Sequence, residues 1–286
     1  MAFPIRQLPP DGFSDLLREI PDKPKMLYLR GELPPPEYKL LCVVGSRATS
    51  IYGRRMCQAL IAGLARYPVA IVSGLALGID AEAHKAALDA GLATVAVLPS
   101  SCDDSSIYPA SNRGLAQRIL EKGGALVSEN PGPYRPQLFD FAKRNRIGAG
   151  MALATLIIEA GEKSGTLITA RLALDYNREV LAVPHELGRE SGAGVNRLIR
   201  EGATLVRNSE DILEALGLKV EDAAEASFPS DLTPAEAKIL EALAEALEKD
   251  ELIERAGLSA QEANIALSSL QIRGLVEERL GKIVRT

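Results

Sequence analysis

The sequence has few of the residues from which metal and redox centres are built. Its 286 residues include three cysteines and two histidines. Cys42, Cys57 and Cys102 lie far apart, without the paired spacing of a zinc site or a redox motif. Widely spaced thiols of this kind are typical of proteins in a reducing compartment. We therefore predict thiols that are either buried or incidental, and no metal site.

The motifs of the common catalytic sites are also missing. His84 and His185 are the two histidines, and neither belongs to an evident nucleophile–base arrangement. The sequence has no Walker lysine motif, no dinucleotide fingerprint and no carboxylate cluster with metal spacing. These absences argue against an enzyme and predict that the chain uses no cofactor.

Long hydrophobic runs are absent as well. The longest apolar stretch, residues 147–158, is too short and too rich in glycine to span a bilayer. The N-terminus lacks the basic start and the apolar run of a signal peptide. The sequence predicts a cytoplasmic protein that does not bind membranes.

Acidic residues outnumber basic ones, and the net charge is −5. The excess lies at the C-terminal end, because residues 210–286 hold 17 acidic and 8 basic side chains, a net charge of −9. Residues 1–209 therefore carry +4. Because salt confines the field of a charged patch to about 10 Å, a local basic groove is compatible with the acidic total. Any nucleic-acid site is expected within residues 1–209.

A regular alternation of strand and helix patterns follows a proline-rich lead-in. Residues 1–38 predict an arm with one short helix near Phe13–Ile20. The next apolar runs are short and rich in Val, Ile and Leu, as in strands buried on both faces of a parallel sheet. They are Leu40–Gly45, Val69–Gly74, Thr94–Pro99, Ala125–Ser128, Thr155–Ala160 and Glu179–Pro184. With helical patterns between most of them, residues 39–218 predict a doubly wound α/β domain that binds ligands at the carboxyl ends of its strands.

The composition changes after Leu218. Residues 219–230 are mostly small and acidic and predict a linker. Residues 231–286 predict three helices and a hairpin, the outline of a winged-helix domain. The third helix, Ala260–Gly274, offers one cation, Arg273, which favours a protein-contact or regulatory role over DNA reading.

Four loops at successive strand ends suit anions. Gly45 allows close approach to the backbone, and Ser46 and Arg47 supply a donor and a cation, although an ordinary turn with a solvated arginine explains this tripeptide equally well. The stretch Ser73–Asp80 places two glycines before a helix, with Asp80 as its expected cap and His84 as a structural histidine.

The other two loops are the basic cluster Phe141–Arg146 and the turn Lys163–Thr166. The first combines three cations with an aromatic residue, as in a phosphate track with a stacking platform. A solvated helix start is the alternative, but the apolar sequence after Arg146 indicates that the segment is held against the core. The second places hydroxyls and backbone N–H groups at the start of a helix.

Eight motifs occur in one order between about Leu27 and Val206. They are Val-Gly-Ser-Arg47, Ser73–Asp80 with Ala83-His84, Ile107-Tyr-Pro109, Ser128-Glu129, Arg144–Ile147, Lys163–Arg171, Arg178-Glu-Val180 and Asn196–Ala203. Together they resemble the DprA (Smf) family, the DNA-processing proteins of bacterial natural transformation. The resemblance implies an extended Rossmann-like fold that binds and protects single-stranded DNA and loads the RecA recombinase onto it.

The resemblance also assigns residues. It implies a DNA-binding site made of Gly45, Ser46, Arg47, Ser73, Gly74, Gly78, Phe141, Lys143, Arg144, Asn145, Arg146, Lys163, Ser164, Gly165 and Thr166. It implies self-association through the C-terminal part of the core, for which Leu198, Ile199 and Leu205 are candidates.

Four positions depart from the family pattern. Leu77 replaces an arginine and removes one potential phosphate contact, Ala142 replaces a proline, Gly148 replaces an isoleucine, and His185 replaces a glycine. These departures affect the expected shape and affinity of the pocket.

Two other functions compete with DNA binding. The same fold is similar to the LOG-type phosphoribohydrolases, but Thr169 stands where their catalytic glutamate is expected. A transcription regulator that reads an operator through residues 231–286 is the second alternative, and the acidic third helix argues against it.

Overall fold

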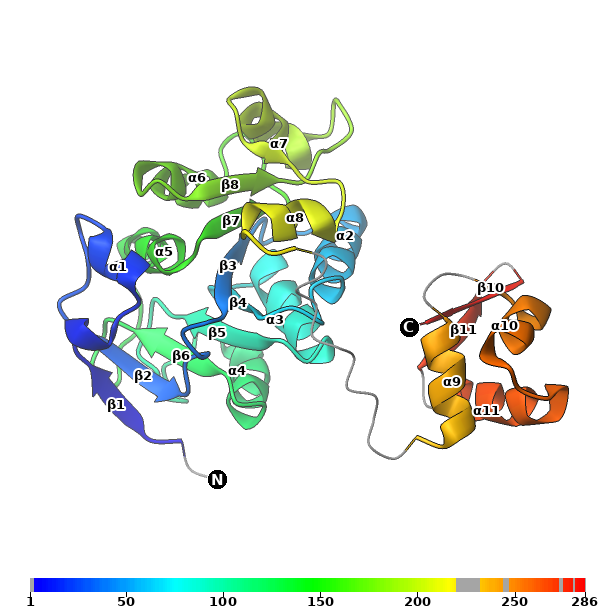
Figure 1. The fold of residues 1–286 in the computed structure, drawn as a ribbon. Helices are drawn as coiled ribbons and strands as arrows, with labels where there is room; N and C mark the ends of the chain where they lie inside the picture. The colour runs from blue at the N-terminus through cyan, green and yellow to red at the C-terminus, as the bar shows by residue number, and fades with distance from the viewer. Residues whose placement is uncertain (1–2, 220–231, 244–246, 273–274, 280, 286) are drawn as a thin grey trace. The chain divides into compact units, whose positions relative to one another are not determined.

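The computed structural model describes residues 3–219, 232–243, 247–272, 275–279 and 281–285. The chain divides into two compact units, residues 1–224 and 225–286 (Figure 1). The described part of the larger unit contains a nine-stranded sheet in the order β1-β2-β6-β5-β4-β3-β7-β8-β9, and that of the smaller unit a three-stranded sheet in the order β10-β12-β11.

The middle of the large sheet is parallel and buried, as the six apolar runs predict. Its strands are β3 (Lys39–Val44), β4 (Val69–Ser73), β5 (Ala93–Val97), β6 (Ala125–Ser128), β7 (Ala154–Ile157) and β8 (Glu179–Ala182). The short strand β9 (Thr204–Leu205) adds to β8, again in parallel. The prediction of a doubly wound parallel sheet is confirmed.

The proline-rich lead-in, which the sequence predicts as an arm, contributes two strands to the sheet. Strands β1 (Ile5–Leu8) and β2 (Leu27–Gly31) pair with each other, and β2 pairs antiparallel with β6. Leu27 and Leu29 are buried while Tyr28 between them is partly exposed, which is the alternation of a strand with one face on the core. The short helix α1 (Asp15–Glu19) lies within the predicted range, after the 3₁₀ turn η1 (Pro10–Gly12).

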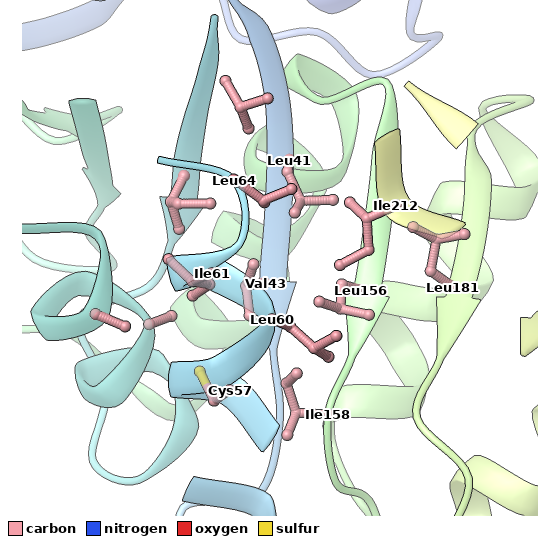
Figure 2. Packing of buried hydrophobic residues seen from close by; sticks show 14 of the residues in the cluster. Leu41, Val43, Cys57, Leu60, Ile61, Leu64, Leu156, Ile158, Leu181 and Ile212 are labelled. Atoms are coloured by element: carbon pink, nitrogen blue, oxygen red, sulfur yellow. The ribbon is translucent and has the colours of Figure 1, made fainter. Parts of the chain in front are cut away.

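Helices cover both faces of this sheet because its strands alternate apolar side chains to either side. One face carries α2 (Ile51–Ala62), α3 (Ile79–Asp89), α4 (Arg113–Glu121, after the turn η2, Ala110–Asn112) and α8 (Ser209–Ala215). The other carries α1, α5 (Leu138–Met151), α6 (Thr166–Asp175) and α7 (Glu190–Arg200). Figure 2 shows Leu41 and Val43 of β3 packed against Leu60 and Ile61 of α2 on the first face.

The three cysteines are free and buried, which is the first of the two alternatives predicted for them. Burial raises the pKa of each thiol to about 12, so all three are neutral near pH 7. None of the helices in the described ranges is long and apolar enough to cross a membrane.

The smaller unit has the winged-helix fold that its sequence predicts. It contains α9 (Pro234–Ala242), β10 (Leu247–Glu248), α10 (Lys249–Ala256), α11 (Ala260–Ile272), β11 (Val276–Arg279) and β12 (Lys282–Arg285). Thr233 and Glu236 form a capping box at the start of α9. Arg273 and all but the first residue of the predicted linker 219–230 lie outside the described residues, and the exact domain limits remain predictions.

His84 makes the stability of the larger unit depend on pH. Its side chain is fully buried in α3, with Nδ1 2.7 Å from the Thr94 hydroxyl. Burial lowers its pKa to about 3, below the ordinary value of 6.5. Between these values the unfolded chain binds a proton that the folded chain does not, so stability falls as the pH drops below about 6.5.

We expect acidification from pH 6.5 to 5 to remove about 2 kcal/mol of unfolding free energy through His84, since one pKa unit corresponds to about 1.4 kcal/mol. Urea unfolding at both pH values measures this. His84→Leu should lose this part of the pH dependence, whereas His185→Asn should keep it. An unchanged pH dependence in His84→Leu would contradict the assignment.

Candidate nucleic-acid interface

The carboxyl ends of the parallel strands meet at one edge of the sheet. From β3 the chain proceeds through β4 and β5 to β6 on one side, and then returns to place β7 on the other side of β3. The strand order therefore reverses between β3 and β7, and such switch points are where open α/β sheets bind ligands. The loops that follow β3, β4 and β7 are those expected to suit anions.

The loop after β3 is tied to both of its neighbours. The Ser46 N–H donates to the Glu159 carbonyl after β7 (2.7 Å), and the Ser46 carbonyl accepts from the Ile79 N–H of α3 (3.1 Å). A Cβ atom at Gly45 would lie 2.6 Å from the Ile79 side chain, so only glycine fits there. Arg47 follows this pinned turn and is exposed. The two hydrogen bonds of Ser46 therefore fix the backbone position next to the exposed Arg47.

The loop after β4 is shaped by two glycines. Gly78 has φ +76°, and a Cβ atom there would lie 2.2 Å from the Ser46 carbonyl oxygen. A Cβ atom at Gly74 would lie 1.8 Å from a guanidinium nitrogen of Arg144. Ser73 is buried and donates its hydroxyl to the Val43 carbonyl (2.6 Å). Gly74 and Gly78 thus allow neighbouring segments to pack closely against this loop. The Ser73 hydroxyl is already bonded to the Val43 carbonyl.

Arg144 points into the protein instead of toward solvent. Its side chain is 9% exposed, donates to the Val97 carbonyl (2.5 Å) and lies 4.0 Å from the Asp80 carboxylate. Burial lowers the pKa of Arg144 and raises that of Asp80, and the attraction between them opposes both changes. Asp80 is not the cap of α3 as expected, because Gly78 holds that position and the buried Asp80 faces Arg144.

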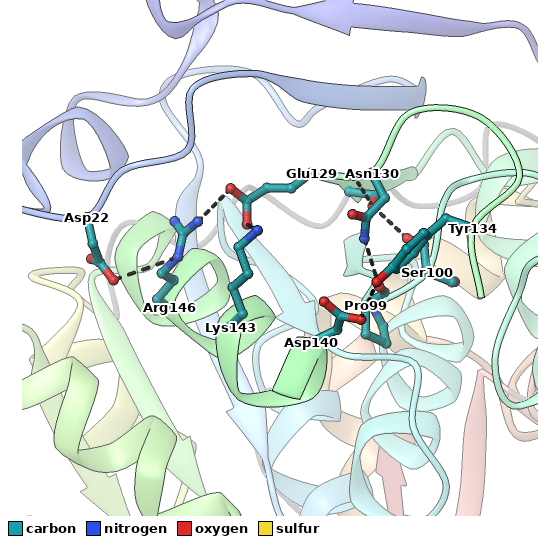
Figure 3. A network of polar contacts seen from close by, with 10 residues as sticks. Asp22, Pro99, Ser100, Glu129, Asn130, Tyr134, Asp140, Lys143 and Arg146 are labelled. Carbon is teal, nitrogen blue, oxygen red and sulfur yellow. Dashed lines mark hydrogen bonds and ion pairs between the residues drawn. The ribbon is translucent and has the colours of Figure 1, made fainter. Parts of the chain in front are cut away.

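The buried Arg146 side chain belongs to a second polar network, which reaches the surface at Asp22 and Lys143 (Figure 3). Its guanidinium donates to Glu129 (2.5 Å) and lies 3.7 Å from Asp22. Lys143 lies 3.7 Å from the same Glu129, and its side chain is 51% exposed. Of the three cations in the predicted basic cluster, Lys143 alone is well exposed, while Arg144 and Arg146 hold α5 against the sheet.

An aromatic surface lies beside Arg47. The Arg47 guanidinium carbon is 4.9 Å from the centre of the Phe141 ring. The Phe141 ring meets Tyr108 edge to face, with centroids 5.7 Å apart, and Tyr108 is exposed. We call Arg47, Phe141 and Tyr108 the aromatic–arginine cluster. Sequence reasoning included Tyr108 in a family motif but did not assign it to the site.

The turn after β7 lies at the same edge of the sheet. The Ser164 hydroxyl accepts from the Thr166 N–H (3.2 Å) and lies 3.0 Å from the Thr166 hydroxyl, at the start of α6. Lys163 and Gly165 are exposed. A small cavity of about 20 Å³ lies between α6, α5 and the loop after β4. Its lining includes Gly74, Arg144, Asn145 and Thr169. All the predicted DNA-binding segments therefore lie at the carboxyl edge.

The arrangement offers exposed cations, an aromatic face and backbone turns. Within the described residues no group of three or more His, Cys, Asp or Glu side chains could hold a metal ion. The cations and aromatic rings at this edge can bind an anionic ligand with flat rings.

Comparison with known proteins places the chain in a family. Residues 7–217 match the family model described as DNA recombination-mediator protein A, and residues 221–282 match that of the DprA winged helix domain. The chain is 41% identical to protein Smf of Escherichia coli over 92% of its own length and 72% of the relative's. It is 40% identical to a putative DNA processing protein DprA of Mycobacterium tuberculosis, of which it spans 62%.

Two solved structures are similar. DNA processing protein A of Streptococcus pneumoniae matches with a TM-score of 0.68 and 37% identity, over 74% of each chain. The protein from Helicobacter pylori, described for its single-stranded DNA binding mode, matches with a TM-score of 0.66 and 28% identity, over 77% of this chain and 98% of that one. On its sequence motifs, its fold and these matches, the chain belongs to the DNA processing protein A (DprA/Smf) family.

Proposed function

We propose that this chain binds single-stranded DNA along the carboxyl edge of its large sheet and catalyses no reaction. The aromatic–arginine cluster carries the proposal, because it joins a positioned cation to two aromatic rings. Bases stack on such rings whatever their identity, and cations hold the phosphates between them. In a duplex the bases are already stacked and paired, so an aromatic platform favours single strands.

The predicted site residues divide between contact and support. Arg47, Lys143 and Lys163 are exposed and contact phosphates, and Phe141 stacks with a base. A second group holds the loops in place through the contacts described above. Its members are Gly45, Ser46, Ser73, Gly74, Gly78, Arg144 and Arg146. The remaining predicted site residues lie at the same edge of the sheet. They are Asn145, Ser164, Gly165 and Thr166. The single-stranded DNA binding described for the H. pylori relative supports single-stranded DNA as the ligand.

We further infer a cellular role, which membership of the family supports. The chain protects incoming single-stranded DNA in natural transformation and loads a RecA recombinase onto it, acting as a homodimer. Ile199 is partly exposed and Leu205 lies exposed on the edge strand β9, so both suit the dimer surface, whereas Leu198 is packed in the chain's own core.

The absence of catalysis separates this proposal from a phosphoribohydrolase. Thr169, at the position of that family's glutamate, is buried and lines the 20 Å³ cavity, where it offers no carboxylate. Incubation with AMP tests the alternative, and release of free adenine would contradict the non-catalytic assignment.

Lys143→Gln should weaken binding modestly and make it less sensitive to salt. The substitution removes one cation near the phosphates, so the slope of log affinity against log salt should fall by about one contact, roughly 0.7 for a single strand. Titrations of a labelled oligonucleotide at several salt concentrations measure the slope. An unchanged slope would remove Lys143 from the interface.

A further inference from the structure

A groove of about 540 Å³ lies at the carboxyl edge and belongs to none of the predicted site segments. It lies between the start of α2 and the loop that follows β8. Its lining residues are Ser50, Ile51, Tyr52, His185, Glu186 and Arg189.

Two aromatic rings form one wall of the groove and are both anchored. Tyr52 and His185 meet edge to face with ring centroids 5.0 Å apart. The Tyr52 hydroxyl donates to the Pro184 carbonyl (2.8 Å), and the His185 ring contacts the Ile158 carbonyl (2.8 Å). Gly192 leaves the room that His185 needs, since a Cβ atom there would lie 2.2 Å from the His185 Cβ. The wall is fixed before any ligand arrives, which lowers the entropy cost of binding.

The mouth of the groove exposes large apolar side chains next to the cation of Arg189. Tyr52 is 43% exposed and Ile51 is 79% exposed, although both are large apolar side chains at the mouth of the groove. Arg189 is 65% exposed and pairs with Glu186 (2.9 Å), a contact that an anionic ligand can replace at little cost. The groove therefore suits a ligand that has both an apolar face and a negative charge.

The groove continues the proposed DNA interface. Ser50 lies three residues after Arg47 in the loop that follows β3, and Tyr52 extends the same segment to the end of β8. We propose that this groove is a second nucleotide subsite, in which a base of the bound single strand lies against Tyr52 and Ile51 and a phosphate contacts Arg189. This proposal rests on the proposed function.

The subsite is tested with oligothymidylates of two lengths, about 5 and about 15 nucleotides, which bracket common site sizes. Tyr52→Ala and Arg189→Ala in the full chain should each weaken binding of the long strand by roughly tenfold, the usual order for one stacked base or one charged contact. Both should leave the short strand unchanged, because it fills only the aromatic–arginine cluster. Tyr52→Phe keeps the ring without the hydrogen bond to Pro184 and should bind both strands as the wild type does.

The possible outcomes separate the subsite from the function on which it rests. Wild-type affinity of Tyr52→Ala and Arg189→Ala for the long strand would overturn the subsite, and so would equal losses for both lengths. If Arg47→Ala still weakens both strands in those cases, the proposed function stands without the subsite. If the wild type binds neither strand, the proposed function itself fails.

Discussion

Replacing Arg47 by Ala should lower the affinity for single-stranded DNA by about 10- to 100-fold. The substitution removes a charge-assisted contact to a phosphate, which contributes about 1.5–3 kcal/mol. It also removes the cation that lies over the Phe141 ring. Because the turn before Arg47 is pinned by Ser46 and Gly45, no neighbouring cation replaces it without moving the backbone.

Arg118→Ala is the matched control for this experiment. Arg118 lies on α4, exposed and paired with Asp89 (3.4 Å), and its loss removes the same charge from the protein. Anisotropy titrations at one salt concentration should show a large loss for Arg47→Ala and nearly wild-type binding for Arg118→Ala. Similar affinities of the two variants would remove Arg47 from the site.

Asp80→Ala should lower the free energy of unfolding of the larger unit by about 3–5 kcal/mol, the usual cost of removing one partner of a buried ion pair. The substitution leaves the buried Arg144 guanidinium without its carboxylate. It also removes the acceptor of the Gly74 and Ala76 backbone N–H groups. Urea unfolding followed by circular dichroism measures the change.

Asp89→Ala provides the control, since it removes the same side chain from the same helix at an exposed ion pair. Exposed pairs contribute about 0–1 kcal/mol, so this variant should unfold almost as the wild type does. A loss for Asp80→Ala no larger than for Asp89→Ala would show that Arg144 does not depend on Asp80.

The parallel core was predictable from the sequence because its strands are buried on both faces. Continuous runs of Val, Ile and Leu between helical patterns are typical of parallel sheets that are covered by helices on both faces. The strand β2 was missed because its five residues lie between prolines, and only Leu27 and Leu29 of this strand face the core. Its pairing with β6 is a long-range contact that no local pattern reveals.

The gathering of the candidate residues at one edge of the sheet was predictable, but the burial of two of their arginines was not. The rule that parallel strands share a carboxyl edge was sufficient to bring Arg47 and the basic cluster together. Arg144 and Arg146 have the same charge as Lys143 in the sequence, and their burial depends on Asp80 and Glu129, which other elements supply. The contact between Tyr108 and Phe141 likewise depends on the folded structure.

We propose that the carboxyl edge of the large sheet binds single-stranded DNA. This proposal is tested by the affinity of the full chain for one labelled oligonucleotide, measured single-stranded and annealed to its complement over a series of salt concentrations. We predict tighter binding of the single strand, with an affinity that falls steeply as salt increases. Equal or tighter binding of the duplex, or no binding of the single strand at low salt, would contradict the account.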